Sequence, residues 1–460
     1  MHRREFLSGS LFAATAGLAL DACAPESYGV IPILIPEEPF VPGEEAWLHS
    51  TCFECPAGCG LLVRKIDGRL VKVEGNAEDP ASRGGVCARG QALPQAMYHP
   101  DRIREPLVRD GDRGRGKWKK ASWDEALDRI ASEISRAAVP VGFLTGQMSG
   151  HRGAMVRRFL AAMGGQHLVH EPFTTAPIRR AHELSTGHAA LFDLDPAASS
   201  YVVSFGAEIL ESHTSPVRFA RGLAEMRQGR PGRRGKFVMV GPRLSLTAAN
   251  ADEWIPARPG SELDLALGAA SLILEENLHD QEFAASSTSG LEEFVTLVSE
   301  RAKVRDVADR TGIPLKRIEK LARELSQHRP AVALAGGSSI RSPQGVALAL
   351  AVSHLNALLG SYRDLRIANV GPSFFEWPAL ATEAAAPPRS LAAELMEGED
   401  LPSVLFITDT NPMHSLPSAF GLGERLARCS LVVSFASYPD ESSRMADVIL
   451  PESMAFERFE

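Results

Sequence analysis

Short apolar runs alternate with longer amphipathic stretches along most of the chain. The runs are rich in β-branched residues and end at Gly, Pro or Asp; they cover 141–146, 199–206, 235–243, 331–337, 403–412 and 430–439. Runs of this kind are typical of strands buried on both faces of a parallel sheet. Between them lie helical patterns such as 122–138, where Ser122 and Glu125 form a capping box. The alternation predicts an α/β fold with doubly wound parallel sheets, which bind ligands at the carboxyl ends of their strands.

Length and composition narrow the class of protein further. A chain of 460 residues is longer than one hydrophobic core needs, so we expect two or three lobes. With a formal net charge of -8 and 23% charged residues, the chain has no basic field for DNA or RNA, and nucleic acids are excluded as partners. After the N-terminus, no apolar stretch is long enough to cross a bilayer.

The first residues have the parts of an export signal. The pair Arg3-Arg4 precedes a short apolar segment, an order that resembles the twin-arginine signal of proteins exported in the folded state. We assign 1–23 to this signal; Cys23 is either an acylation site that anchors the protein to lipid or lies near an ordinary cleavage point. Residues 24–46 contain five prolines and are expected to form an extended tether. The protein is therefore expected in the periplasm or on the outer face of the cytoplasmic membrane.

Four cysteines form the most informative chemical pattern. Cys52, Cys55 and Cys59 follow the spacing C-x2-C-x3-C, and Cys87 comes later in the chain. The first three are too close together to pair comfortably as disulfides, and zinc sites more often use two separated C-x2-C pairs. A compact loop with three thiolates and one remote thiolate favours a [4Fe-4S] cluster, with zinc and disulfides as the alternatives. The remaining cysteine of the body, Cys429, is expected to be a small core residue.

Several segments in a characteristic order carry a resemblance to a known family. They are "GGVCARG" around the fourth cysteine, "YHPDRIREPLVR", "NADEWIPARPGSELDLALG", "DTNPMHSLP" and "SRMADVILPESMAFER". With these segments the chain resembles the molybdopterin guanine dinucleotide oxidoreductases, which include formate dehydrogenases, periplasmic nitrate reductases and polysulfide reductases. The resemblance implies a small N-terminal [4Fe-4S] domain followed by two doubly wound lobes, one inserted in the other. It also implies that the family's C-terminal barrel domain is absent from this sequence.

The resemblance sets expected domain boundaries and the role of one arginine. We expect the cluster domain at 47–108, the first lobe at 109–140 plus 338–460, and the inserted lobe at 141–337. Arg89 lies two residues after Cys87, at a position where the family has a Lys or Arg between the cluster and the pterin. It is expected to be an electron relay, because a fixed cation stabilises added electron density; a solvated arginine is the alternative.

The segment that should supply a protein ligand to molybdenum or tungsten departs from the family. Residues 167–184 contain no Cys or Asp, and Thr174 and Thr175 are the nearest candidates. Threonine is a poor ligand without a strong activating base. Glu171 is a carboxylate in the same segment, but a role as cap or salt-bridge partner of a nearby arginine competes with metal binding.

The predicted nucleotide pockets keep some family features and lose others. Arg258, Gly260 and Glu262 preserve a loop whose carboxylate is able to pair with guanine, and Arg243 preserves a phosphate partner. Gly241 replaces the aspartate expected before Pro-Arg, so that anchor is missing. A small polar pair after the strand ending at Phe205 is replaced by Ala207-Glu208, which brings a repulsive carboxylate toward a phosphate.

These departures resemble the molybdopterin-like large subunits of quinol-linked respiratory complexes, such as alternative complex III and menaquinol reductase. The first hypothesis is an iron-sulfur oxidoreductase subunit that carries electrons without catalytic molybdenum. Its expected partners are a ferredoxin-like iron-sulfur subunit and a membrane quinol-interacting subunit. The second hypothesis is an active molybdenum or tungsten enzyme that binds molybdopterin guanine dinucleotide but lacks its C-terminal domain here. A structural protein that holds zinc is the third, and no catalytic role is assigned to His151, His167, His170 or His213.

Overall fold

The computed structural model describes residues 43–136, 140–148, 150–172, 175–188, 191, 193–228, 234–363, 368–369 and 388–457. The chain divides into two compact units, Met1–Glu45 and Ala46–Glu460, and almost all described residues belong to the second. The predicted export signal and nearly all of the predicted tether therefore lie outside the described residues. None of the described helices combines the length and the apolar character needed to span a membrane.

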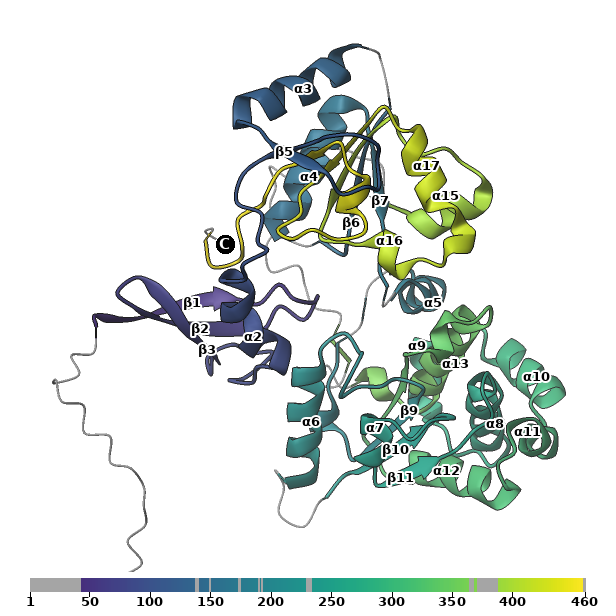
Figure 1. The fold of residues 1–460 in the computed structure, drawn as a ribbon. Coiled ribbons are helices and arrows are strands. Elements are labelled where there is room, and N and C mark those ends of the chain that lie inside the picture. Colours follow the sequence, from purple (N-terminus) through teal and green to yellow (C-terminus); the bar gives the residue numbers. More distant parts are fainter. Residues whose placement is uncertain are drawn as a thin grey trace, which may run out of the picture. The chain divides into compact units, whose positions relative to one another are not determined.

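The N-terminal domain is a small sheet with one helix packed on it (Figure 1). Its strands are β1 (Glu45–Thr51), β2 (Gly60–Ile66) and β3 (Arg69–Gly75), in the order β1-β2-β3, and β2 pairs antiparallel with β3. Helix α2 (Ala88–Met97) follows. A core that includes Leu61, Val73 and Leu93 joins helix and sheet. Two loops carry the four cysteines: one links β1 to β2, and the other links β3 to α2.

The first lobe is built on a mixed sheet to which the described chain contributes eight strands, in the order β14-β7-β6-β15-β16-β17-β4-β5. The strands β14, β7, β6, β15, β16 and β17 pair in parallel, whereas β4 and β5 complete one edge antiparallel. The strands are β4 (Leu107–Arg109), β5 (Trp118–Lys120), β6 (Val141–Thr145), β7 (Gln166–Val169), β14 (Arg389–Ser390), β15 (Val404–Thr408), β16 (Leu431–Ser434) and β17 (Val448–Ile449). The helices are α3 (Trp123–Arg136), α4 (Gly150–Met163), α15 (Leu391–Glu397), α16 (Pro412–Ser415) and α17 (Leu422–Arg428).

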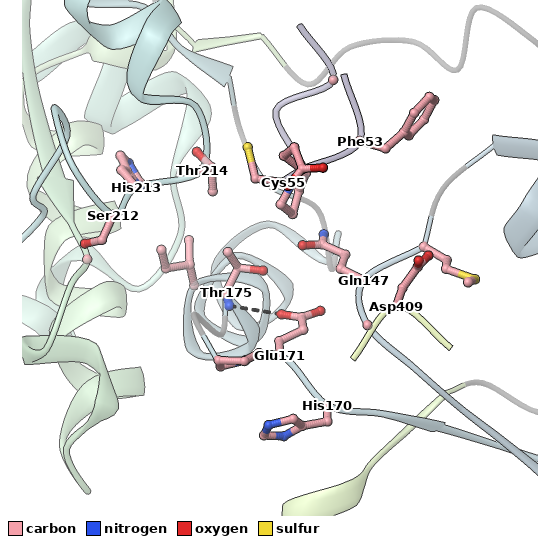
Figure 2. Close-up of a pocket in the computed structure, with 18 of the residues that line it drawn as sticks. Phe53, Cys55, Gln147, His170, Glu171, Thr175, Ser212, His213, Thr214 and Asp409 are labelled. Atoms are coloured by element: carbon pink, nitrogen blue, oxygen red, sulfur yellow. Dashed lines mark hydrogen bonds between the residues drawn. The ribbon is translucent and has the colours of Figure 1, made fainter. Parts of the chain in front are cut away.

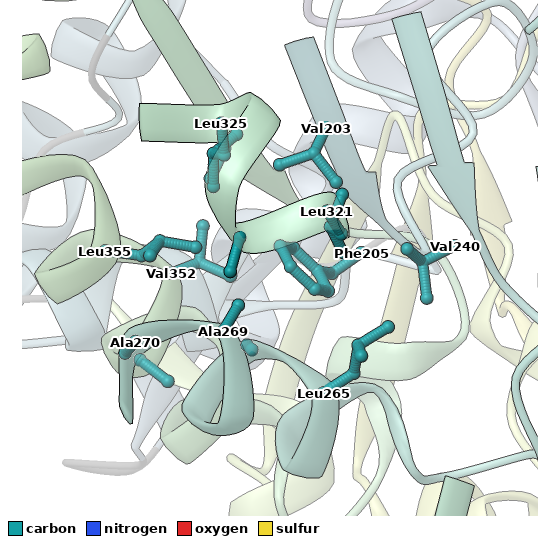
Figure 3. Packing of buried hydrophobic residues seen from close by; sticks show 14 of the residues in the cluster. Val203, Phe205, Val240, Leu265, Ala269, Ala270, Leu321, Leu325, Val352 and Leu355 are labelled. Carbon is teal, nitrogen blue, oxygen red and sulfur yellow. The ribbon is translucent and has the colours of Figure 1, made fainter. Parts of the chain in front are cut away.

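The second lobe has an all-parallel sheet, ordered β11-β10-β9-β12 in its described part. Apolar side chains from the sheet and from α8, α12 and α13 form its largest core (Figure 3). The strands are β9 (Tyr201–Phe205), β10 (Lys236–Val240), β11 (Glu253–Ile255) and β12 (Ala331–Ala335). The helices are α5 (Ala176–Thr186), α6 (Pro216–Gln228), α7 (Leu246–Ala249), α8 (Glu262–Glu275), α9 (Gln281–Ser287), α10 (Leu291–Arg301), α11 (Val304–Thr311), α12 (Leu315–Gln327) and α13 (Gly345–Leu358).

Shorter elements connect these parts. A two-stranded antiparallel ladder joins β8 (Asp193–Leu194) to β13 (Ala368–Asn369). The described 3-10 turns are η1 (Pro196–Ala198), η2 (Ser339–Arg341), η3 (Ser361–Arg363), η4 (Ser418–Phe420) and η5 (Ser443–Met445).

The predicted fold class is confirmed, including the insertion of one lobe in the other. Each predicted apolar run contains a strand, and the predicted helix at 122–138 is α3, whose capping box joins Ser122 and Glu125 reciprocally. The insertion follows from strand order, because all strands of the second sheet lie in sequence between β7 and β15 of the first.

The predicted boundaries of the inserted lobe are wrong at both ends. β6 begins at Val141 but pairs with β15 of the first sheet, and β7 pairs with β6, so the insertion starts after β7. At the other end, α13 lies beyond residue 337 and still packs its Leu348, Val352 and Leu355 into the core of the second lobe. The physical reason is that an apolar run shows that a strand is buried but not which strand pairs with it.

A buried aspartate holds the antiparallel edge of the first sheet. Asp447, 1% exposed, accepts hydrogen bonds from the guanidinium groups of Arg109 and Arg113 and from the N–H of Val432. Burial by itself raises the pKa of Asp447, but the hydrogen bonds from Arg113, Val432 and Arg109 outweigh burial and hold the pKa below its usual value. The carboxylate therefore ties β16 and the segment before β17 to β4 and to Arg113.

We predict that Asp447→Asn lowers the free energy of unfolding by about 3 kcal/mol at neutral pH, because two arginines lose their buried counter-charge. Urea denaturation measures the change. Asp400→Asn is the matched control, since Asp400 makes an exposed ion pair with Arg428 and should have little effect. Because the folded pKa of Asp447 is depressed, its contribution is present above the unfolded value of 3.8 and disappears as pH falls through the lower folded pKa. A deficit in the variant that persists unchanged at the acid end would contradict this assignment.

Candidate functional site

A cavity of about 580 Å³ lies where the cysteine loop meets the carboxyl ends of strands from both sheets. The cysteine-bearing domain contributes residues 53–56, Gly58 and Arg89, and the first lobe contributes the segments after β6, β7 and β15. The second lobe contributes the segments after β9 and β12. Figure 2 shows Cys55, Glu171, His213 and Asp409 arranged around this space. Parallel strands place their following loops at one edge of the sheet, which explains why so many separate segments meet here.

The structure brings together the four cysteines that the sequence singled out. The N–H of Cys52 donates to the carbonyl oxygen of Cys59 at 2.8 Å and closes the first loop, while Cys87 is the N-cap residue of α2. Electrostatic interaction links the thiol of Cys59 to those of Cys52, Cys55 and Cys87, so all four lie near one another. The structure shows all four as free thiols.

The thiols differ in how readily they ionise. Burial raises the pKa of Cys52 and of Cys59 to about 11. For Cys87, burial is outweighed by hydrogen bonds from the N–H groups of Gly90 and Arg89 and from the Arg89 side chain, and the pKa falls below its usual value. Cys87 therefore loses its proton more readily than the buried Cys52 and Cys59, from which metal binding must displace protons.

The donor set fits an iron-sulfur cluster. Within the described ranges, no three His, Cys, Asp or Glu side chains converge as ligands of one metal ion. In a [4Fe-4S] cluster each thiolate bonds a different iron, so the four sulfurs surround a volume instead of a point. Gly90 also keeps the cluster loop open, because a Cβ at that position would lie 2.5 Å from Val86 Cγ2 and 3.9 Å from Cys52 Sγ.

Arg89 lies on the cavity wall beside the cysteines. Its side chain and N–H contribute to the lowered pKa of Cys87. Its charge also acts on Glu54, where burial raises the carboxyl pKa and Arg89 partly opposes the rise. Arg89 therefore occupies the position expected of a cation between cluster and cavity; the relay role itself stays a prediction.

The candidate metal ligands of the first lobe are only partly described. Glu171 accepts from the N–H of Thr175 at 3.3 Å and from Arg179 at 3.1 Å, so its carboxylate serves as a cap and ion-pair partner (Figure 2). Thr175 is 7% exposed, lines the cavity, and its hydroxyl has no hydrogen-bond partner among the described residues. Thr174 lies outside the described residues.

A second pocket of about 350 Å³ lies at the carboxyl ends of β9, β10 and β12. Arg243, the predicted phosphate partner, lines it but is ion-paired to Glu208 from the neighbouring loop. Gly241 also lines this pocket, at the position where the resemblance led us to expect an aspartate. The hydroxyl of Ser339, which is 8% exposed, is buried in the same pocket without a partner among the described residues.

The other predicted nucleotide residues are not brought to these two cavities. Arg258 donates to the carbonyl oxygens of Asp309, at 2.6 Å, and Arg310 at the end of α11. Gly260 has a positive φ of 80°, and Glu262 is buried at the first position of α8. In the described part of the chain, Arg258, Gly260 and Glu262 line neither cavity. Arg258 and Gly260 lie in the loop between β11 and α8, Glu262 begins α8, and the binding role of all three stays a prediction.

Sequence reasoning missed a charged group on the cavity wall. Arg152 donates to Asp409 at 2.8 Å and to Glu452 at 3.1 Å, and both Arg152 and Asp409 line the larger cavity. His170, also on the wall, bonds Ser415 through Nε2 at 2.7 Å, and burial lowers its pKa. Their positions in the sequence could have identified them. Arg152 follows the predicted strand run 141–146 and Asp409 lies near the end of the run 403–412, and parallel sheets bind ligands at the edge where their strands end.

Comparison with family models assigns the chain. Residues 45–99 match the model of the molybdopterin oxidoreductase Fe4S4 domain, and residues 102–460 match the model named molybdopterin oxidoreductase. The chain belongs to the molybdopterin oxidoreductase family. The N-terminal part of the chain is a domain of the Fe4S4 type, so the interpretation of the cysteines made from their spacing is confirmed at the level of the domain.

Individual members of the molybdopterin oxidoreductase family resemble the chain at moderate identity. The menaquinone reductase, molybdopterin-binding-like subunit of Nitratidesulfovibrio vulgaris is 29% identical over 433 residues, covering 91% of this chain and 60% of that protein. The thiosulfate reductase molybdopterin-containing subunit PhsA of Salmonella typhimurium is 26% identical over 498 residues, covering 100% of this chain and 64% of that protein. The chain thus spans less than two thirds of the length of either relative.

A solved structure supports the fold. Acetylene hydratase from Pelobacter acetylenicus superposes with a TM-score of 0.77 over 89% of this chain and 63% of that protein. The sequences are 21% identical, so this likeness concerns the arrangement of the backbone.

We predict that the double variant Cys52→Ala/Cys59→Ala loses nearly all of the roughly four irons expected per chain, because two of four ligands are removed. Iron analysis and visible absorption after anaerobic purification measure the loss. Cys429→Ala is the control: this thiol is also buried, but it belongs to the core of the first lobe. Iron retained in the double variant, or lost equally in the control, would contradict the ligand assignment.

Proposed function

We propose that this chain is an electron-transfer subunit of an exported, membrane-attached respiratory complex and that it works without catalytic molybdenum. The observation that carries the proposal is that the Cys52, Cys55, Cys59 and Cys87 thiols lie near one another, with Cys55 on the wall of the large cavity. When bound by these residues, a [4Fe-4S] cluster supplies one-electron transfer.

The contacts of Glu171, the candidate carboxylate ligand, support a function without catalytic molybdenum. Glu171 is already engaged by Arg179 and by the N–H of Thr175, and so is poorly placed to give its charge to a metal. The chain also resembles a subunit whose name describes it as molybdopterin-binding-like.

The residues around the thiols are suited to holding an electron at this position. Arg89 places a positive charge beside Cys87, which stabilises the reduced form of a cluster relative to the oxidised form. Burial of Cys52 and Cys59 limits access of water to that side of the site. The protein groups therefore set the potential and exclude solvent.

The proposed partners follow from the need for an electron donor and an acceptor. A ferredoxin-like iron-sulfur subunit and a membrane quinol-interacting subunit satisfy that need, and relatives are named as subunits of a menaquinone reductase and a thiosulfate reductase. The twin-arginine pattern at 1–23 supports export, with attachment through partners or through Cys23.

A second candidate function is an active molybdenum or tungsten reductase or dehydrogenase that binds molybdopterin guanine dinucleotide. The specific observation in its favour is Thr175, which lines the cavity and whose buried hydroxyl has no partner among the described residues. An oxygen at this position is a chemically acceptable ligand for a hard, oxidised metal.

Metal analysis separates the two functions. For protein purified anaerobically with its partners, we expect about four irons per chain and no stoichiometric molybdenum or tungsten. Reductive titration followed by electron paramagnetic resonance should then show a single cluster signal from this chain. Molybdenum or tungsten at one atom per chain would instead establish the second function.

The role of Arg89 has its own test. We predict that Arg89→Gln lowers the midpoint potential of the cluster on the order of 50 mV, because a nearby positive charge is lost and the oxidised form gains relative stability. Potentiometric titration with spectroscopic detection measures the shift. Arg69→Gln is the matched control, since Arg69 belongs to the same domain but lies over the ring of Tyr98. Equal midpoint potentials in Arg89→Gln and wild type would contradict the proposed role of Arg89 as an electron relay.

A further inference from the structure

Each sheet has a point where successive connections run in opposite directions. In the second lobe the chain passes from β9 to β10 and β11 on one side, whereas β12 lies on the other side of β9. In the first lobe β6 leads to β7 on one side, and β15 leads to β16 on the other. The loops that leave these strands diverge and form a crevice, and nucleotides with pyrophosphate groups commonly bind in crevices of this type.

In the second lobe, the arginine of this crevice forms an ion pair with a carboxylate of the same chain. Glu208, in the loop after β9, is ion-paired to Arg243, in the loop after β10. The second oxygen of Glu208 accepts from the hydroxyl of Ser212 at 3.1 Å, which fixes the carboxylate in place. Its side chain is 19% exposed, so the negative charge is held inside the pocket instead of in free solvent.

The pocket has the features of a ligand site apart from this charge. Arg243, Arg341 and Ser339 line the pocket. The buried hydroxyl of Ser339 has no hydrogen-bond partner among the described residues. The backbone at Gly206 and Gly337 adopts positive φ values of 76° and 62°, and the two strand-end loops are in close contact there. The site is therefore formed, and Glu208 is its built-in anion.

The first lobe repeats the arrangement. Asp409, directly after β15, reaches Arg152 at 2.8 Å across the crevice, and Glu452 reaches the same guanidinium at 3.1 Å. Asp409 has a φ of 53°, a left-handed conformation that glycine adopts more easily. An acidic side chain at such a position has a local conformational cost, which its ion pair with Arg152 helps to offset.

We propose that Glu208 and Asp409 are internal counter-anions that reduce the affinity of both crevices for a nucleotide pyrophosphate. A pyrophosphate entering either crevice must take the arginine away from its carboxylate and then remain close to that negative charge. Each arginine thus remains in its crevice, but its anionic partner is a side chain of the same protein. This inference deepens the proposed function and rests on it, because crevices with low affinity for a nucleotide pyrophosphate would hold a molybdopterin guanine dinucleotide poorly.

The test uses GDP, which carries both a guanine and a pyrophosphate. Isothermal titration of the purified chain should show weak binding by the wild type, and Glu208→Gln/Asp409→Asn should bind GDP at least about tenfold more tightly, because each replacement removes a charge and keeps the side-chain size. The gain should shrink at high salt. Adding Arg243→Gln and Arg152→Gln should abolish it. Inorganic pyrophosphate, titrated in parallel, separates recognition of the phosphates from recognition of the base.

Matched controls and a second measurement keep the test decisive. Glu276→Gln and Asp400→Asn remove carboxylates that pair with Arg323 and Arg428 on exposed surfaces, and should leave GDP affinity unchanged. Asp409→Gly gives a variant whose backbone accepts the left-handed conformation if the asparagine variant is unstable. Equal GDP affinity in wild type and variants, or release of stoichiometric guanine nucleotide from denatured wild type, would overturn the inference. Unchanged GDP affinity with no molybdenum present would leave the proposed function intact, whereas molybdenum in the wild type would refute that function.

Discussion

All parallel strands of a sheet deliver their following loops to the same edge, and the chemistry of this protein depends on that constraint. The two sheets share no strand, yet loops after β6, β7 and β15 of one and after β9 and β12 of the other line a single cavity. The N-terminal domain also lines this space, through Cys55 of its first loop and Arg89 of α2. Cys55 and the loops at the ends of the strands are therefore adjacent although they come from segments far apart in the sequence.

Charge pairing is the second theme of the cavity. In Glu171 with Arg179 and Asp409 with Arg152, a carboxylate that follows a strand pairs with an arginine of a helix; in the second pocket, Glu208 pairs with Arg243 of another loop. A site that must bind an anion leaves its cations available, whereas a site whose cations are paired internally is neutral and rigid. In this chain Arg89, on the cavity wall beside the cysteine thiols, acts on Cys87 and Glu54.

The sequence predicted local features well because local physics determines them. The strand runs, the capping box of α3 and the spacing of the four cysteines depend on neighbouring residues, and the structure agrees with them. Which strand pairs with which, and which side chains form ion pairs, was not predictable in the same way. The run at 141–146 was assigned to the wrong lobe because its pairing with β15 is a long-range event. The ion pairs of Arg152 and Arg243 were missed for the same reason, since each joins loops that only the folded sheet brings together.

The nested arrangement also sets an order for folding. The strands of the second sheet, β9 to β12, form a continuous part of the chain, but Val141 of β6 pairs with Val404 of β15 across the whole of that part. Closing such a long loop has a large entropic cost while the inserted segment is unfolded, and a smaller one after it has become compact. We therefore expect the second lobe to fold early and the central strands of the first sheet to join late. Until β15 pairs with β6, one wall of the cavity is missing. A bulky cofactor would therefore enter the cavity most easily at this stage of folding.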